Sequence, residues 1–453
     1  MQRPEFPTLI ESRAGRKMSA IEIFEVTNRR EKALAKLLVA YISTGLAFML
    51  LPGTFLGVWN LISISSRHSS ERISTAWIQA HGHAQVFGWI GSFILGIGFY
   101  SIPKLRRLEP FAIGSAWVCW GMWTAGVTLR WVATVYGTYW RAFLPVSAAL
   151  ELVALAFFLR AVSTHRLQSG DTKDQRWVMI VMAGAAGFVT AIGMNLVESV
   201  RLAIRGLGPA FPSDFDQRLF AVMAWGFMVP FVWGFSTKWL PIFLGLQPTK
   251  IRLMLVGTVL NIVGVISAVA AHLLTAAVVW LAASAITVMA LRIFQSSMQS
   301  AKTKGVHQTF PVFVRIAYVW LLVAGGSAVW AALRIEAAGI WGASRHALTV
   351  GFIAMMVFCV GQRVLPAFAG MKVLWSPRLM FAATSLLGLG CFLRVTCEVL
   401  AYQGSASWAW KVLPVSAVTE LAAVTAFAAN IIMSFVRQSS AQPIVHVPAR
   451  PNA

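Results

Sequence analysis

Long apolar stretches separated by short loops constrain this chain more than any other feature of its sequence. A helix needs about 20 mostly apolar residues to cross a bilayer. Twelve such stretches can be placed, at residues 35–60, 84–104, 111–134, 142–162, 177–200, 218–240, 252–270, 273–292, 313–334, 346–366, 378–401 and 411–436. Only 12% of the residues are charged, about half the share in soluble domains. The sequence therefore predicts an all-α polytopic membrane protein with twelve transmembrane helices.

The basic residues predict the orientation of these helices. The chain has 38 Lys and Arg against 16 Asp and Glu, a net charge of +22, and most basic residues lie in loops between apolar stretches. We interpret them as topology determinants and expect no nucleic-acid partner, because cytoplasmic loops carry an excess of Lys and Arg. Basic residues are densest in the N-terminal segment and after every second span, so both termini are predicted to be cytoplasmic. The predicted parts are a cytoplasmic segment 1–34, one membrane domain 35–436 and a cytoplasmic tail 437–453.

The apolar region contains an internal repeat of four spans. The segment from His83 to Pro103 aligns with that from His346 to Pro366 at an offset of 263, with matching His, Ala, Gly and Pro residues. Two spans later, LPVSAALELVALAFF (144–158) aligns with LPVSAVTELAAVTAF (413–427), with nine identities in fifteen. A weaker copy lies between them, where Ala221 takes the place of His346. Repeats of this kind indicate repeated structural units, so we predict three pseudo-symmetric four-helix repeats at about 35–162, 177–292 and 313–436.

Four histidines, His81, His83, His272 and His346, lie at the predicted outer ends of spans. Ionisable groups at membrane depth are costly and mark functional sites, and imidazole is a common ligand of haem and metals. His83 and His346 occupy equivalent repeat positions, so two helices can offer their rings to opposite faces of one haem iron. His81 points about 200° away from His83 on a helix, towards a second metal, a propionate or no ligand. His272 is a further candidate metal ligand. For each, the alternative is an interfacial histidine hydrogen-bonded to a neighbour.

Three arginines are predicted to lie near these histidines. Arg130 and Arg394 occupy related places in spans 3 and 11, and Arg345 directly precedes His346. Arg binds carboxylates through two parallel hydrogen bonds, so these guanidinium groups suit the propionates of a haem. The alternative for Arg394 is an ion pair with Glu398 one helical turn later.

Two further carboxyl groups, Glu151 and Glu420, are related by the repeat and lie in the middle of their spans. A buried carboxyl group needs a partner or a proton. A protonated structural residue and a proton-delivery residue are both compatible with the sequence.

The segments HGHAQVFGWIGSFILGIGFYSIPK (81–104) and RHALTVGFIAMMVFCVGQRVLPAFAG (345–370) resemble the NnrS family. Its members are twelve-span membrane proteins of the bacterial plasma membrane, linked to nitric oxide and nitrosative stress and described as containing haem and copper. The resemblance implies haem b and copper as cofactors, nitric oxide or a related small molecule as ligand, and an electron donor as partner. More distantly, three arcs of four helices resemble subunit I of the haem–copper oxidases, which would place haem ligands on spans 2 and 10.

The sequence departs from the oxidase pattern at the copper ligands. Span 10 has only one histidine, span 6 has none, and only His272 lies near span 7. A copper centre with three histidines cannot be built from these residues, so proton-pumping oxygen reduction is not expected. Any copper must use His81, His272, methionines or a carboxylate.

Three functions therefore compete. The first is a haem protein that binds or processes nitric oxide or its products, as an enzyme, a sensor or a store. The second is a cofactor-free transporter whose histidines line a polar path. The third is a protein that handles or assembles haem or copper for other proteins. The symmetric pair His83 and His346 favours the first function.

Overall fold

The computed structural model describes residues 10–11, 17–18, 20–69, 73–105, 111–163, 176–334, 338–368 and 374–439. In these ranges the regular structure is helical, apart from one antiparallel pair of short strands. These are β1 (Ile10–Glu11) and β2 (Lys17–Met18), with Ile10 opposite Met18. Most of the predicted tail 437–453 lies outside the described residues.

The first third of the described chain forms four long helical segments, two of them containing a π-helical section. Their bounds are α1 (Ala20–Phe48), η1 (Met49–Phe55) and α2 (Leu56–Arg67) in continuous succession, then α3 (Thr75–His83), η2 (Ala84–Gly91) and α4 (Ser92–Leu105), then α5 (Ile113–Tyr136) and α6 (Trp140–Ser163).

The remaining chain forms four long helical segments twice more, with the second segment of each set interrupted by π-helix. The middle part comprises α7 (Arg176–Arg205), α8 (Ser213–Ala221), η4 (Val222–Met228), α9 (Val229–Leu244), α10 (Ile251–Val269) and α11 (Leu273–Leu291). The last part comprises α12 (Phe310–Ala332), α13 (Ala338–His346), η5 (Ala347–Ala354), η6 (Val357–Gly361), α14 (Gln362–Phe368), α15 (Pro377–Tyr402) and α16 (Ala409–Ser439). In each part a nine-residue helix leads directly into a π-helix. These nine-residue helices end at His83, Ala221 and His346.

Eleven helices in the described part of the chain are long and apolar enough to span a membrane. Each coincides with one of the predicted spans. The predicted span 111–134 also forms a helix, the 24-residue α5, but α5 is not among the eleven. It carries Arg130 and four tryptophans, which lower its mean hydropathy. The chain is therefore a multi-pass helical membrane protein.

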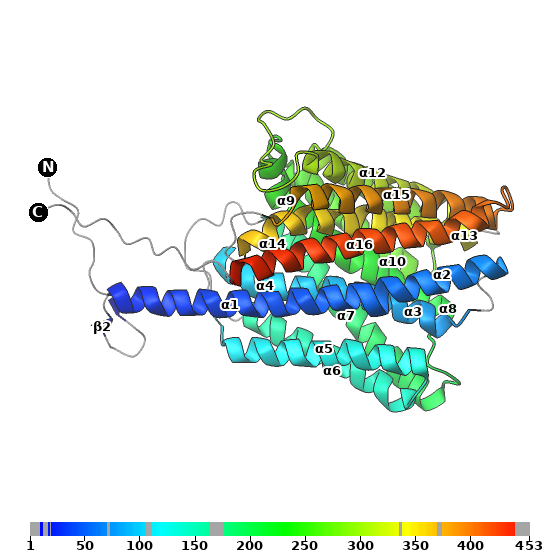
Figure 1. Cartoon of the computed structure of the whole chain (residues 1–453). Helices are drawn as coiled ribbons and strands as arrows, with labels where there is room; N and C mark the ends of the chain where they lie inside the picture. The colour runs from blue at the N-terminus through cyan, green and yellow to red at the C-terminus, as the bar shows by residue number, and fades with distance from the viewer. Residues whose placement is uncertain are drawn as a thin grey trace, which may run out of the picture.

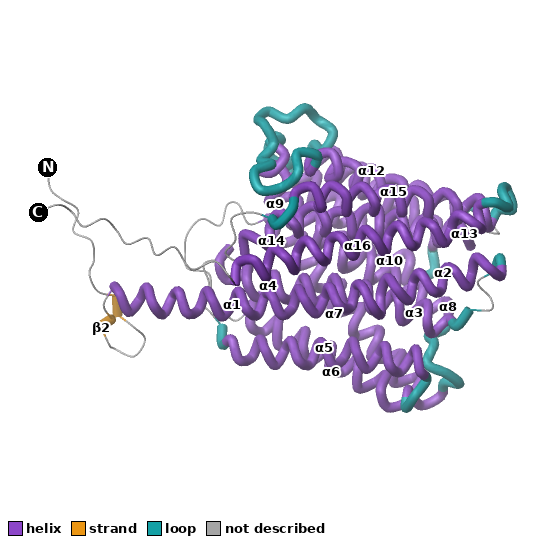
Figure 2. The backbone as a smooth tube through the Cα atoms, in the orientation of Figure 1, coloured by secondary structure: helices purple, strands orange, loops and turns teal. Residues whose placement is uncertain are grey.

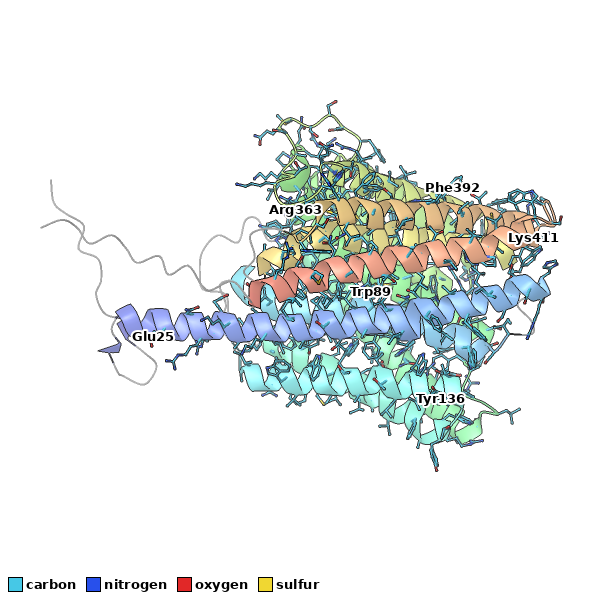
Figure 3. All side chains as sticks on the ribbon, in the orientation of Figure 1. Glu25, Trp89, Tyr136, Arg363, Phe392 and Lys411 are labelled. Atoms are coloured by element: carbon cyan, nitrogen blue, oxygen red, sulfur yellow. The ribbon has the colours of Figure 1, made fainter. Side chains whose placement is uncertain are left out.

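The helices run roughly parallel and antiparallel in one bundle (Figure 1). The start of α1 and the end of α16 lie at the same end of the bundle. The turns and loops between helices gather at the two ends (Figure 2). Apolar side chains such as Phe392, which is 56% exposed, cover the outer surface (Figure 3). This is the surface that a bilayer would contact, since lipid tails are as apolar as the residues facing them.

Three pairs of neighbouring helices pack most extensively: α5 with α6, α10 with α11, and α15 with α16. Each pair meets at a glycine. A Cβ atom added to Gly126 would lie 2.9 Å from Cγ of Glu151, and one added to Gly390 would lie 2.6 Å from Cγ of Glu420. In the middle pair, a Cβ atom on Gly257 would lie 2.8 Å from Oγ1 of Thr287. The same close approach therefore occurs three times, with threonine replacing glutamate once.

Several helices begin earlier than the hydropathy pattern predicts. Helix α3 begins at Thr75, whereas the predicted span begins at residue 84, and α13 begins at Ala338, eight residues before the predicted start at His346. Polar residues in these first turns lower the local hydropathy, but they pack inside the bundle and the helix continues through them. His81, His83 and His346 consequently lie inside helical segments and not at their first residue.

Candidate functional site

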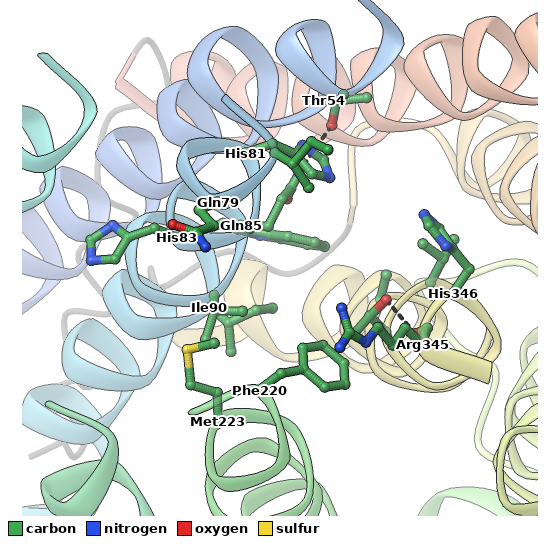
Figure 4. Close-up of a pocket in the computed structure, with 18 of the residues that line it drawn as sticks. Thr54, Gln79, His81, His83, Gln85, Ile90, Phe220, Met223, Arg345 and His346 are labelled. Atoms are coloured by element: carbon green, nitrogen blue, oxygen red, sulfur yellow. Dashed lines mark hydrogen bonds between the residues drawn. The ribbon is translucent and has the colours of Figure 1, made fainter. Parts of the chain in front are cut away.

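A cavity of ≈ 310 Å³ lies among the helices where the three nine-residue helices come together. Figure 4 shows part of its wall. Residues from segments far apart in the sequence line it, from α2 to α16. The polar residues of the lining are Thr54, Asn60, Gln79, His81, His83, Gln85, Arg130, Asn195, Asp216, Arg345, His346, Thr349, Arg394 and Glu420. The cavity therefore brings together every predicted site residue except His272, together with the repeat-related Glu420.

His81 is held against the first helix by its Nδ1 atom. This atom lies 2.8 Å from the carbonyl oxygen of Gly53, so the ring donates from Nδ1 and leaves the lone pair on Nε2. The ring packs on Gly57, where an added Cβ atom would lie 2.6 Å from Cε1 of His81. Gln85, one turn later on the same face, donates to Oγ1 of Thr54 at 2.9 Å. The π-helix η1 and α2 thus fix the ring from one side, and its other side faces the cavity.

His346 is held in the same manner on the opposite wall. Its Nδ1 atom lies 3.0 Å from the carbonyl oxygen of Gly342 and 3.6 Å from Oε2 of Glu398. Nε2 is again left with its lone pair. Figure 4 shows the rings of His81 and His346 on two sides of one space. A hydrogen bond from Nδ1 to a carbonyl or carboxylate is the usual arrangement behind a histidine that binds a metal through Nε2.

His83 has a different environment. It lies on the other side of its helix from His81 (Figure 4). Its Nε2 atom lies 3.1 Å from Oε1 of Glu151 on α6, and the two side chains are 7% and 0% exposed. His83 also packs on Phe87, with ring centroids 4.8 Å apart. His83 also lines the cavity, but its Nε2 atom lies beside Glu151 without meeting hydrogen-bond geometry, on another side of the helix from the ring of His81.

Three buried or partly buried arginines surround the cavity. Arg130 is 2% exposed, lies with Cζ 4.1 Å from the ring centroid of Phe211, and donates from Nη1 to Oγ of Ser199 at 3.4 Å. Arg345 lies in the same way over Phe220, with Cζ 4.7 Å from the centroid. Cation–π contacts of this kind orient the guanidinium group without satisfying its N–H donors. Within the described residues, Nε of Arg130 makes no hydrogen bond.

Arg394 forms an ion pair with Glu398, which the sequence analysis gave as the alternative to binding a propionate. Its Nε atom lies 3.3 Å from Oε2 of Glu398, one turn later on α15. Its Nη1 atom makes no hydrogen bond within the described residues. Glu398 thus lies between Arg394 and His346 and links the two. Arg394 keeps donors available for an anionic group in the cavity.

Glu420 lines the cavity, and its Oε1 atom has no hydrogen-bond partner among the described residues. Nδ2 of Asn195, also in the lining, is likewise unpaired in that part of the chain. Buried polar atoms are normally hydrogen-bonded. Such unpaired atoms around one cavity are expected where a polar ligand or ordered water completes the site.

His272 does not line the cavity. It is exposed and precedes the first residue of α11, in the turn that divides the apolar run 252–292 into two spans. Among the described residues, no group of three or more His, Cys, Asp or Glu side chains lies close enough to hold a metal ion. The described His, Cys, Asp and Glu side chains therefore do not supply the three ligands of a copper centre of the oxidase kind.

Sequence reasoning missed seven of the fourteen polar residues of the lining, among them Gln79 and Asp216. Gln79 on α3 exchanges two hydrogen bonds with the backbone of Phe211, at 2.9 Å from Nε2 and 2.8 Å to Oε1. Asp216 on α8 lines the cavity together with Arg130 and Arg345. Both precede the apolar part of their spans, so a search restricted to apolar stretches does not reach them.

The fold places the chain among known membrane proteins. It is similar to a chain of a haem–copper terminal oxidase dimer solved by cryo-electron microscopy, with a TM-score of 0.65, 11% sequence identity, and coverage of 89% of this chain and 84% of that chain. At this identity the similarity shows the fold alone. No curated protein matches the chain. The protein is thus a helical membrane protein with the fold of a haem–copper oxidase chain.

A comparison of the sequence with family models gives a more specific assignment than the fold. A family model described as "NnrS protein" matches residues 35–438, which is nearly all of the helical region. The chain belongs to the NnrS family. The resemblance drawn from residues 81–104 and 345–370 is therefore confirmed.

Proposed function

We propose that this protein binds haem b between His81 and His346 and uses it to bind or process nitric oxide or its products in nitrosative stress defence. One observation carries the proposal. Two imidazole rings on different helices face one cavity, and each donates from Nδ1 to a backbone carbonyl oxygen. The family and the fold support the same class of protein, because the solved neighbour is a haem–copper oxidase.

The geometry favours His81 over His83 as the partner of His346. An axial ligand needs a free Nε2 lone pair directed at the iron. The Nδ1 bond of His81 leaves its Nε2 atom for the cavity, whereas Nε2 of His83, although it makes no hydrogen bond among the described residues, lies 3.1 Å from Oε1 of Glu151. Glu398 behind His346 would make that imidazole a stronger ligand, as carboxylates behind metal-bound histidines do.

The arginines suit the propionates of such a haem. Arg130 and Arg394 each keep a nitrogen without a hydrogen-bond partner among the described residues. Both line the cavity that His81 and His346 face. Charge-assisted hydrogen bonds to carboxylates are about twice as strong as neutral ones. The chain therefore offers two imidazoles for an iron and guanidinium donors for carboxylates, which is the donor set that haem b requires.

Haem b, held by His81 and His346, would supply one-electron chemistry and an iron able to bind nitric oxide. The protein's own residues would orient the ring, neutralise its carboxylates and exclude water from its faces. Turnover of nitric oxide would also need an electron donor. We place this donor on the outer side of the membrane. Nitric oxide is the ligand that the resemblance of residues 81–104 and 345–370 to the NnrS family implies.

The wider architecture is part of the proposal. We infer twelve spans, with α5 as the twelfth, in three pseudo-symmetric arcs with both termini in the bacterial cytoplasm. The shared end of α1 and α16 supports an even number of spans. The three matching glycine contacts and the three nine-residue helices support the arcs. Residues 35–436 then form one membrane domain.

The test is the pyridine haemochrome spectrum of the detergent-purified protein and of three variants. The wild type should contain b-type haem, and His81→Ala and His346→Ala should lose most of it. His83→Ala is the matched control, since it removes an imidazole from the same helix turn without removing a ligand. Nitric oxide added to the reduced wild type should shift its Soret band.

Two outcomes would contradict the proposal in different ways. If His83→Ala loses haem while His81→Ala keeps it, the pair predicted from the repeat, His83 and His346, is the ligand pair. If the wild type is colourless after expression with ample haem, the haem proposal fails. A cofactor-free transporter then becomes the leading function.

A further inference from the structure

A second cavity, of ≈ 630 Å³, lies at the opposite end of the bundle from the histidines. It is formed by the start of α7, the end of α9, the start of α10 and the loop that follows α11. Figure 2 shows the loops of this region beside α9. Positive residues are most frequent in the loops at this end, and their distribution predicts that this end faces the cytoplasm.

The charged side chains that line this second cavity are all cationic. They are Arg176, Lys238 and Lys302. Lys238 is only partly exposed and lies with Nζ 5.9 Å from the ring centroid of Trp177. No ion pair joins any of the three to a carboxylate in the part of the chain that the structure describes. For Lys238 and Lys302 the sequence explains why, since no Asp or Glu occurs between Asp216 and Glu336.

The wall of this cavity is held in place by backbone contacts. The amide of Met298 donates to the carbonyl oxygen of Gly245 at 2.8 Å, and that of Lys302 donates to Phe243 at 2.9 Å. Gly245 has a φ of +68°, and an added Cβ atom there would collide with the backbone of Gln299. The loop is thus pinned to the end of α9, and Lys302 is presented from a fixed segment. The N-terminus of α10 also lines the cavity, and its dipole adds to the positive potential.

The rim of the cavity is apolar and open. Ile242 and Met298 line it and are 43% and 68% exposed. A soluble anion needs no apolar surface beside the cations that bind it. A phospholipid needs both, because its phosphate is anionic and its glycerol and acyl groups are apolar. Basic pockets between transmembrane helices on the cytoplasmic side are known to bind anionic lipid headgroups.

We propose that this cavity binds the phosphate of an anionic phospholipid of the inner leaflet, with Arg176, Lys238 and Lys302 as the cationic contacts and Ile242 and Met298 against its apolar part. The inference is independent of haem binding, since the two cavities share no lining residue.

Native mass spectrometry of the full-length protein tests this site. Delipidated protein is titrated with phosphatidylglycerol or with phosphatidylcholine of the same acyl chains. The wild type should retain phosphatidylglycerol selectively. Lys238→Gln and Lys302→Gln should each weaken retention about fivefold, because a cation near anionic lipid contributes about one kcal/mol. Lys304→Gln is the matched control, since it removes a cation from the same loop but not from the cavity lining.

The outcomes separate binding of a phospholipid from binding of a soluble anion. Equal retention of both lipids, or equal retention by the Lys238→Gln and wild-type proteins, would overturn the proposal. Displacement of phosphatidylglycerol by equimolar orthophosphate would also overturn it, because the site would then recognise a soluble anion. If Lys238→Gln fails to fold, Arg176→Gln provides the same test from another helix. A haem spectrum unchanged in every folded variant is expected.

Discussion

Gly57 lies against the ring of His81, and a larger residue there would move the ring. A Cβ atom at this position would lie 2.6 Å from Cε1 and 2.8 Å from Nδ1, the atom that bonds to Gly53. Gly57→Ala should therefore displace the imidazole and reduce the haem content, or shift the Soret band, without removing any ligand. Optical spectra at equal protein concentration measure this.

The control for this prediction is Gly121→Ala on α5. No heavy atom lies within 4 Å of a Cβ atom added there. Alanine is favoured over glycine in a helix by about one kcal/mol, so this variant should keep its haem and be at least as stable. Full haem content and an unchanged spectrum in Gly57→Ala would show that His81 is not an axial ligand.

The contact between His83 and Glu151 predicts a structural role for His83. Both side chains are buried and Nε2 of His83 lies 3.1 Å from Oε1 of Glu151, although neither atom meets hydrogen-bond geometry among the described residues. Removing either side chain leaves the other buried without its polar neighbour, which costs stability, whereas removing both relieves part of that cost. A double-mutant cycle of His83→Leu and Glu151→Leu should give a coupling free energy of about one kcal/mol, as for polar pairs between membrane helices.

Reversible unfolding in detergent measures this coupling. Full additivity of the two single variants would contradict a direct interaction between them. Glu151→Gln is a useful companion variant, since it keeps a carbonyl oxygen near Nε2 of His83 while removing the ionisable carboxyl group.

At the scale of helices, three glycines allow three helix pairs to approach closely. Gly126, Gly257 and Gly390 each meet the side chain of an adjacent helix at under 3 Å from an added Cβ atom. Alanine at any of them should force the pair apart and destabilise the protein by about 1–3 kcal/mol, the usual cost of overpacking. Gly326→Ala on α12, where no heavy atom lies within 4 Å, should not destabilise.

Thermal unfolding in detergent compares these four variants. A clear loss at Gly126 and Gly390 with none at Gly257 would mean that the middle arc is packed differently from the other two. That result would contradict the three-arc architecture, because the arcs are inferred from equivalent contacts in all three.

The helices also explain why the repeat pairs His83 with His346 whereas the contacts around the cavity favour His81, on another face of the same helix, in our proposal. The alignment correctly matches the helix ends at His83 and His346, but an offset in sequence carries no information about the partner of each ring. Residues of η1 and α2 bring Gly53 and Gly57 to His81, and α6 brings Glu151 to His83. These contacts join residues 24 to 68 positions apart, so they depend on packing that the repeat does not encode.

At the scale of the whole molecule, hydropathy predicts the bundle well and its polar interior poorly. Apolar stretches require a membrane, and each predicted span coincides with a helix. A stricter requirement on mean hydropathy leaves α5 out of the eleven helices, because tryptophans and Arg130 lower its value. The hydropathy pattern also cuts off the first turns of α3 and α13, where polar residues pack inward. Residues of the cavity are polar by necessity, so hydropathy is least reliable where the site lies.

The proposed orientation can be tested by labelling introduced cysteines, because the native cysteines should react little. All four, Cys119, Cys359, Cys391 and Cys397, are buried, so a thiol reagent should label the native protein weakly. Leu207, between α7 and α8, is fully exposed, and Phe294, after α11, is 52% exposed. They lie at opposite ends of α8 to α11, and the basic loops assign the end with Phe294 to the cytoplasm. In intact cells a membrane-impermeant maleimide should therefore label Leu207→Cys and should label Phe294→Cys only after permeabilisation. The reverse pattern would place the histidine cavity at the cytoplasmic end, and an electron donor would then have to approach from inside the cell.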